Sequence, residues 1–214
     1  HACGHDVHIA VVAGAVRGLA GVSDELTQRG IGVRAIFQPA EEVMPGGAED
    51  IIEAGWTKDL DMLFGVHCDP SIEVGSVGLR VGAITAAADG ITVILRGRGG
   101  HTSRPHLTED LTSALAKVIT DVPAALSRRI DPRAGLALVW GQMRAGNAAN
   151  VIPSEGMASG TLRMLDAGVW SGARAIVEDL VDKVVAPYGV TAEIDYARGV
   201  PPVVNDANAI EVLR

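Results

Sequence analysis

The six histidines of the chain fall into three short clusters, each beside other residues that can bind a metal ion or transfer a proton. The first cluster is the N-terminal stretch HACGHDVH. Cys3 and His5 are two residues apart, so in an extended loop both side chains lie on one side and can bind one ion. Taken alone, this cluster is better explained as a free thiol beside surface histidines, because structural zinc sites use a second Cys/His pair at short spacing.

The second feature is the acidic pair Glu41 and Glu42 in the motif QPAEE, which follows the apolar segment 31–37. Adjacent carboxylates on extended backbone point in opposite directions. One can therefore bind metal while the other faces a substrate, as metal-assisted hydrolysis requires. A solvated acidic turn is the simpler interpretation of this pair alone.

The second histidine position is His67, which stands alone after the apolar run 60–66. A lone histidine is more often packed or hydrogen-bonded than a metal ligand.

Considered together, these residues predict a metal site. The runs 31–37 and 60–66, with a short helix between them, have the near-continuous apolar character of buried parallel strands and predict a βαβ unit. The carboxyl ends of such strands meet at one edge of the sheet, so the acidic pair and His67 are expected near the first cluster. The resulting sulfur, nitrogen and oxygen ligands suit zinc, manganese, cobalt or nickel rather than calcium: Cys3, His5, Glu42 and His67.

The third histidine cluster lies in the glycine-rich motif GRGGHTSRPH. A phosphate-binding loop is excluded, because the glycine spacing differs and no Lys-Ser/Thr follows. The glycines instead allow a tight turn that presents His101. Farther along, Asn150 and Arg163 add polar groups that can hold a substrate carboxylate, for which arginine is suited by bidentate pairing. An ion pair on a surface strand is the alternative for Arg163.

The order of elements from residue 82 to residue 196 predicts a second module. Apolar alternation and helical periodicity give the order β-α-β-β-α-β, the split βαβ arrangement of two helices on one antiparallel sheet. The expected strands are 88–95, 136–143, 156–164 and 190–196, and the expected helices are 107–126 and 170–185. A first helix is expected after Asp6, and a last, short one after Asp206.

Composition excludes several classes of protein. The chain has 214 residues, 48% hydrophobic and 21% charged, as in globular proteins. A net charge of -8 and only 3% aromatic residues argue against nucleic-acid binding. No apolar run is long enough to span a membrane. We expect a cytoplasmic location. Because the first residue is His1 and the last predicted helix is short, we also expect the chain to be part of a longer protein.

Seven motifs in one order resemble a known family. HACGHDVH, QPAEE, MPGGAEDIIEAG, FGVH, GRGGHTSRPH, NVIP and GTLR are similar to the amidohydrolase branch of the aminoacylase and carboxypeptidase G metallopeptidases, which includes hippurate and auxin-conjugate hydrolases. The resemblance implies an α/β fold. A partial catalytic domain of βαβ units with a mainly parallel sheet would span residues 1–81 and 197–214. An inserted ferredoxin-like α+β domain, residues 82–196, would act as lid and dimer interface.

The resemblance also implies roles for individual residues. The metal ligands of a two-ion centre correspond to Cys3, His5, Glu42 and His67. The general base corresponds to Glu41, and a lid histidine that reaches a neighbour's active site in related enzymes corresponds to His101. Asn150 and Arg163 correspond to lid residues that contact substrate. The implied reaction is hydrolysis of a small N-acyl amino acid, by a homodimer that holds two divalent ions.

Two departures from the family pattern keep alternatives open. The family has an Asp-containing strand before the first motif and a further metal-ligand histidine late in the catalytic domain, and neither is present here. The absent histidine and the complete β-α-β-β-α-β module leave a non-catalytic dimerisation fragment as a competing hypothesis. A metallo-carboxypeptidase or dipeptidase of the same family and a structural Cys/His zinc module are further alternatives. The single Cys-x-His and the double glutamate disfavour the zinc module. Nothing in the sequence selects the acyl group or the metal.

Overall fold

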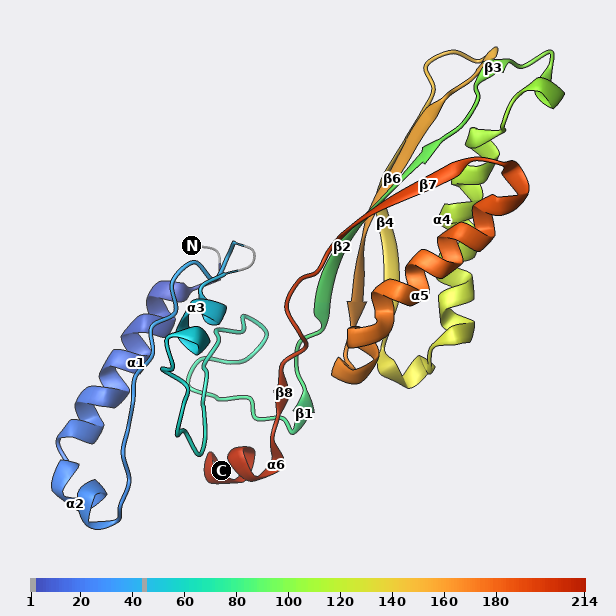
Figure 1. Cartoon of the computed structure of the whole chain (residues 1–214). Coiled ribbons are helices and arrows are strands. Elements are labelled where there is room, and N and C mark those ends of the chain that lie inside the picture. The colour runs from blue at the N-terminus through green and yellow to red at the C-terminus, as the bar shows by residue number, and fades with distance from the viewer. Residues whose placement is uncertain (1–2, 44–45) are drawn as a thin grey trace. The chain divides into compact units, whose positions relative to one another are not determined.

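The computed structural model describes residues 3–43 and 46–214 (Figure 1). His1, at the start of the first motif, and Met44 and Pro45, the first two residues of MPGGAEDIIEAG, lie outside the described residues. The chain divides into two compact units. Unit 1 comprises residues 1–79 and 208–214, and unit 2 comprises residues 80–207. None of the described helices combines the length and the hydropathy needed to cross a membrane.

Unit 2 is built on a four-stranded antiparallel sheet with the strand order β4-β6-β2-β7. The two central strands pair along their whole length, from Ala87 opposite Met164 to Arg96 opposite Glu155. A bulge at Gly141 interrupts the pairing of the edge strand β4 with β6. The sheet strands are β2 (Ala87–Arg96), β4 (Ala137–Ala145), β6 (Glu155–Met164) and β7 (Thr191–Ala197).

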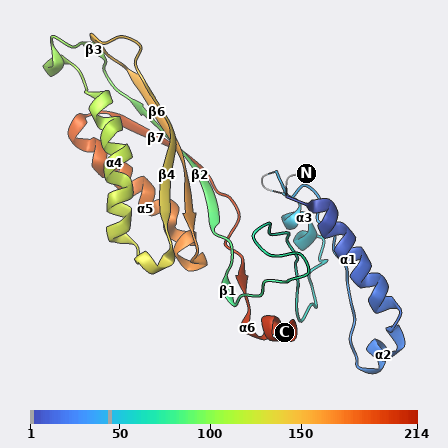
Figure 2. The same ribbon diagram turned by 180° about the vertical axis from the view of Figure 1, so that it is seen from behind.

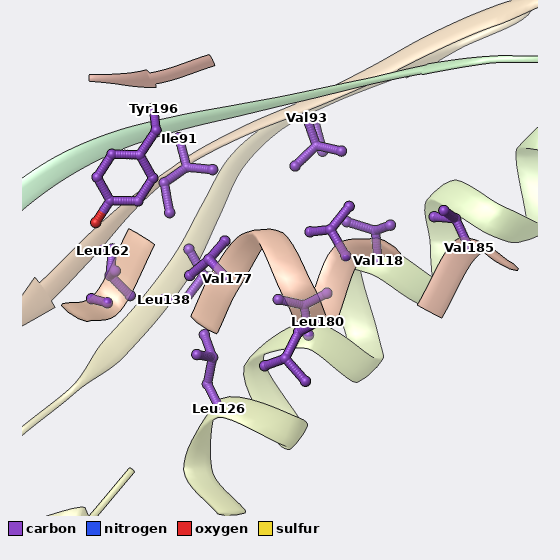
Figure 3. Close-up of a cluster of buried hydrophobic side chains, with 14 of the residues drawn as sticks. Ile91, Val93, Val118, Leu126, Leu138, Leu162, Val177, Leu180, Val185 and Tyr196 are labelled. Atoms are coloured by element: carbon purple, nitrogen blue, oxygen red, sulfur yellow. The ribbon is translucent and has the colours of Figure 1, made fainter. Parts of the chain in front are cut away.

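Two long helices cover one face of this sheet, as both Figure 1 and Figure 2 show. They are α4 (Leu111–Arg129) and α5 (Ala167–Val185). Each begins at an aspartate, Asp110 or Asp166, whose carboxylate accepts a hydrogen bond from the backbone N–H three residues on and so caps the helix. Figure 3 shows the core that results, in which side chains of both helices meet those of the sheet.

Periodicity in the sequence determines which side chains form that core. Every second residue of β2 is buried, and α4 buries one stripe at helical spacing. Full burial of a side chain of this size contributes about 1.5–3 kcal/mol. The largest fully buried side chains all belong to unit 2: Ile91, Leu95, Leu111, Leu115, Leu126, Leu162, Met164, Val93, Val118, Val122, Val177 and Val181.

Two short strand pairs complete unit 2. One pair joins β1 (Gly82–Ala83) and β8 (Val204–Asn205), where the chain enters and leaves the unit. The other joins β3 (Gly100–His101) and β5 (Val151–Ile152). Single 3-10 turns lie at η1 (Pro105–Leu107), η2 (Pro132–Ala134) and η3 (Ala186–Tyr188).

The described residues of unit 1 form four helices and long irregular segments. The helices are α1 (His5–Ala20), α2 (Ser23–Gln28), α3 (Ala48–Glu53) and α6 (Ala207–Val212), the last of which starts at the unit boundary. No residue of α1, α2 or α3 is buried. In α6, Ile210 is buried. Unit 1 therefore leaves most of its described apolar side chains exposed.

The prediction of a mainly parallel sheet in βαβ units is wrong for the described residues. The segments 31–37 and 60–66 form no strand, and every strand pair in the described part of the chain is antiparallel. Phe37 and Leu63 are 53% and 67% exposed. The physical reason is that an apolar run becomes a buried strand only when a neighbouring strand takes up its backbone hydrogen bonds, and none of the described strands lies beside these runs.

The structure confirms the predicted elements of residues 82–196 and the helices that begin near Asp6 and Asp206. It adds the short helix α2. The fold of the described residues has mixed α/β content with antiparallel sheets. The predicted domain limits at 81/82 and 196/197 stay a prediction beside the unit limits at 79/80 and 207/208.

Candidate metal centre

Three of the four predicted metal ligands come together in unit 1. The thiol of Cys3, the imidazole of His5 and the carboxylate of Glu42 have ligand atoms within 4.8 Å of one another. Gly4 adopts a left-handed conformation (φ 73°) directly before α1 begins at His5. This turn brings a thiol and an imidazole from neighbouring positions to the same place.

Both members of the acidic pair approach the same imidazole. The Nε2 atom of His5 lies 3.3 Å from Oε2 of Glu41 and 3.4 Å from Oε1 of Glu42. The prediction that the two carboxylates point in opposite directions on extended backbone is wrong, because Ala40 has a φ of 53° and the chain turns there. The turn places two carboxylates and one imidazole together, at the exposed surface of unit 1.

The chemistry of these donors fits a divalent cation. Hydrogen bonding to Glu42 and the negative charge of its carboxylate raise the pKa of the Cys3 thiol. A cation reverses this effect, because it stabilises thiolate and carboxylate together. The donor atoms around one zinc ion lie about 2.0–2.3 Å from the metal and therefore roughly 3.5 Å from one another. Small movements of these three side chains are enough to reach such distances. Sulfur, nitrogen and oxygen donors in one group suit zinc or another transition metal.

The fourth predicted ligand, His67, is not a member of this three-residue group. Its Nδ1 lies 2.7 Å from the carbonyl oxygen of Cys68, and since a carbonyl only accepts, Nδ1 carries the proton. The lone pair of the neutral ring is then on Nε2. A backbone carbonyl often fixes a metal-binding histidine in this way.

His8, a member of the first cluster, lies between His5 and His67, and sequence reasoning gave it no role. Its ring centroid lies 4.7 Å from that of His67 and 5.5 Å from that of His5. Its Nε2 accepts a hydrogen bond of 2.8 Å from the backbone N–H of Cys68. The available signal was the spacing of three residues between His5 and His8, which places both on one face of a helix.

The other predicted site residues belong to unit 2 and are separated within it. His101 lies on β3, and the N–H of the next residue, Thr102, donates to the carbonyl of Asn150 at 3.1 Å. The predicted site residues His101 and Asn150 are therefore close to each other. Arg163 is paired with Ala88 at the opposite end of β6. At about 3.4 Å per residue, the eight steps from Glu155 to Arg163 span roughly 27 Å. Arg163 is therefore far from His101 and Asn150 in one chain.

Comparison with known proteins gives a consistent family assignment. The family model described as "Peptidase family M20/M25/M40" matches residues 1–214. The chain is 35% identical over 205 residues to the N-acyl-L-amino acid amidohydrolase of Geobacillus stearothermophilus, covering 96% of this chain and 55% of that protein. It is 44% identical over 214 residues to a Rhodococcus jostii protein named as a candidate glutamate–cysteine ligase, covering all of this chain and 26% of that protein.

A solved structure agrees. The YXEP protein of Bacillus subtilis, described as a dinuclear metal binding peptidase from the M20 family, has 26% sequence identity and a TM-score of 0.69. The match covers 99% of this chain and 52% of that chain. The chain thus spans about half the length of several relatives and a quarter of the Rhodococcus protein. With a family model matched over its whole length, the chain belongs to peptidase family M20/M25/M40.

Proposed function

We propose that the protein is a metal-dependent amidohydrolase that cleaves the amide bond of N-acyl amino acids with the help of two divalent ions. One observation carries this proposal: the ligand atoms of Cys3, His5 and Glu42 lie together. The carboxylate of Glu41 lies beside them, with its Oε2 at 3.3 Å from Nε2 of His5. The names of the Geobacillus amidohydrolase and of the N-acetyl-L-cysteine deacetylase of Bacillus subtilis, 34% identical, support the substrate class.

In this proposal the chain's residues divide the work. Cys3, His5, Glu42 and His67 hold the ions, which when bound lower the pKa of water and polarise the amide carbonyl. Glu41 accepts a proton from the attacking water and then delivers it to the leaving amine. One carboxylate can do both, because its role reverses between the two halves of the reaction.

The residues of unit 2 are proposed to act on the substrate. His101 donates a hydrogen bond to the carbonyl oxygen as negative charge develops there. Asn150 and Arg163 bind the carboxylate of the amino acid. Since roughly 27 Å separate the two ends of β6, one small substrate cannot contact both His101 and Arg163 of a single chain. This separation supports a homodimer in which unit 2 is an inserted, ferredoxin-like lid and dimerisation domain.

The first experiment tests the metal and the base together. Purified protein is assayed with hippurate and with N-acetyl amino acids, with and without chelator, and turnover that survives the chelator refutes the metal mechanism. Glu41→Gln is expected to lower kcat by about 10²–10⁴-fold while the bound metal, measured by mass spectrometry, stays unchanged. Glu53→Gln, an exposed change on α3, is the matched control. Near-normal turnover of Glu41→Gln excludes it as the base.

Peptide hydrolysis is a second candidate activity. The thermostable carboxypeptidase 1 of Saccharolobus solfataricus is 35% identical over 203 residues, covering 94% of this chain and 51% of that protein. The two activities share the proposed metal ligands and base, so they differ only in the substrate. A panel that pairs each N-acetyl amino acid with the corresponding dipeptide distinguishes them by kcat/KM.

A further inference from the structure

The turn after β3 brings two donors of one serine to the ring of His101. The Oγ atom of Ser103 lies 2.8 Å from Nδ1 of His101, and the backbone N–H of Ser103 donates to the same Nδ1 at 3.1 Å. The N–H of Arg104 donates to the carbonyl of His101 at 3.0 Å, which closes the turn. The side chain of His101 is thus held by the residue two positions along.

The backbone donor determines where the ring proton resides. A hydroxyl can donate or accept, but a backbone N–H can only donate. The Nδ1 atom must therefore offer a lone pair, and the proton of the neutral ring must be on Nε2. The Ser103 hydroxyl strengthens this arrangement by donating as well.

The remainder of the turn restrains the backbone of His101. His101 pairs with Val151 between β3 and β5, and the next N–H, that of Thr102, donates to Asn150. A Cβ atom on Gly100 would lie 2.7 Å from Cγ2 of Thr108, so the backbone before the histidine is packed closely too. With the backbone restrained on both sides, the principal freedom left to His101 is rotation of its ring. The contacts from Ser103 remove that freedom.

We propose that Ser103 is a positioning residue that holds His101 as its Nε2–H tautomer, so that the ring presents an N–H donor to the substrate. The inference rests on the proposed function and deepens it. A neutral Nε2–H donor suits a carbonyl oxygen on which negative charge develops, and it is unsuited to remove a proton from water. Proton transfer is thereby left to Glu41.

The tautomer can be measured without substrate or metal. ¹⁵N-labelled protein is studied by long-range ¹H–¹⁵N correlation in alkaline buffer, where neutral histidine dominates. Signals of His101 are assigned from His101→Gln, and His106 serves as an internal reference. Wild type is expected to show a protonated Nε2 and an unprotonated Nδ1. Observation of the Nδ1–H form, or of the same mixture as at His106, overturns the proposal.

Three variants separate positioning from general effects. Ser103→Ala is expected to lower the ratio of Nε2–H to Nδ1–H about fivefold, the factor that one net hydrogen bond is worth. Ser103→Thr keeps both donors and is expected to restore it. Ser127→Ala, on α4, removes a hydroxyl that donates to a backbone carbonyl at 2.7 Å and should leave the ratio unchanged. An unchanged ratio in Ser103→Ala overturns the role of its side chain.

Activity gives a second, independent result. Loss of an oxyanion donor costs about 10²–10³ in kcat, so a donor that is only misdirected is expected to cost about tenfold, with little change in KM. A kcat of Ser103→Ala equal to wild type contradicts the proposal. Absence of turnover in wild type refutes the proposed function instead, and the NMR ratios then decide the positioning role alone.

Discussion

Removal of the buried carboxylate of Asp89 should destabilise unit 2 severely. Asp89 is 1% exposed and lies in the buried row of β2, among apolar residues. It accepts hydrogen bonds from the indole N–H of Trp170 at 2.9 and 3.0 Å, from the backbone N–H of Gly199 at 2.8 Å, and from the hydroxyl of Tyr196. One carboxylate thus ties β2 to α5 and to the chain that leaves β7.

The size of the effect follows from the three donors. A donor left without a partner costs about 1–3 kcal/mol, the most for the buried Tyr196 and less for groups that water can reach. Asp89→Ala is therefore expected to lower the free energy of unfolding by about 4 kcal/mol. Asp89→Asn should cost only about 1–2 kcal/mol, because its oxygen can still accept while the tyrosine hydroxyl can turn to accept from the amide.

The assay is urea unfolding followed by circular dichroism, together with hydrogen exchange of the β2 amides. The exchange data assign the loss of stability to unit 2, which a signal from the whole chain cannot do. Tyr196→Phe is the matched control, since it removes one donor and keeps the carboxylate. A loss below about 1 kcal/mol in Asp89→Ala, or equal losses in the Ala and Asn variants, would refute this account of the network.

Three further predictions concern both units. His8→Ala should weaken metal binding about 10–100-fold, because it removes the acceptor that holds the loop carrying His67, and competition with a chelator measures this. Burial, and then the hydrogen bond to the buried carboxylate, raise the pKa of Tyr196 above its ordinary value of about 10. When the pH rises past this ordinary value, the tyrosine loses its phenolic proton in the unfolded state before it does so in the folded state. The free energy of unfolding should therefore fall with rising pH in urea titrations, and Tyr196→Phe should remove this loss. Gly199→Ala should cost about 2–4 kcal/mol in the same titrations, because its Cβ would lie 1.8 Å from the carbonyl oxygen of Ala88.

Sequence patterns predicted unit 2 well because its core is made by its own residues. Leu111, Leu115 and Val118 recur at helical spacing, and all three are fully buried in α4. The same kind of reasoning failed at residues 31–37. An apolar run indicates that burial is favourable but not which neighbour provides it, and none of the described strands pairs with residues 31–37.

The sequence indicated the three residues that the structure groups, Cys3, His5 and Glu42, but not the geometry that brings them together. The two-residue spacing of Cys3 and His5 and the adjacent glutamates indicated the donors. A turn with positive φ at Ala40, a residue that rarely adopts it, brings both carboxylates to one imidazole, and no local sequence signal predicts that turn. The contact between His8 and the backbone of Cys68 joins positions 60 residues apart, which single-sequence periodicity cannot detect.

The pairing of β1 with β8 has a consequence for how unit 2 is joined to the rest of the chain. Gly82 lies opposite Asn205, and Ala83 lies opposite Val204, in an antiparallel pair whose Cα atoms are about 4.5–5.5 Å apart. The chain therefore enters and leaves unit 2 at nearly the same point. More than a hundred residues connect two strands that lie as close together as the strands of a tight hairpin. A segment with its ends this close can be excised and closed by a two-residue turn, or exchanged for another module, without stretching the flanking chain.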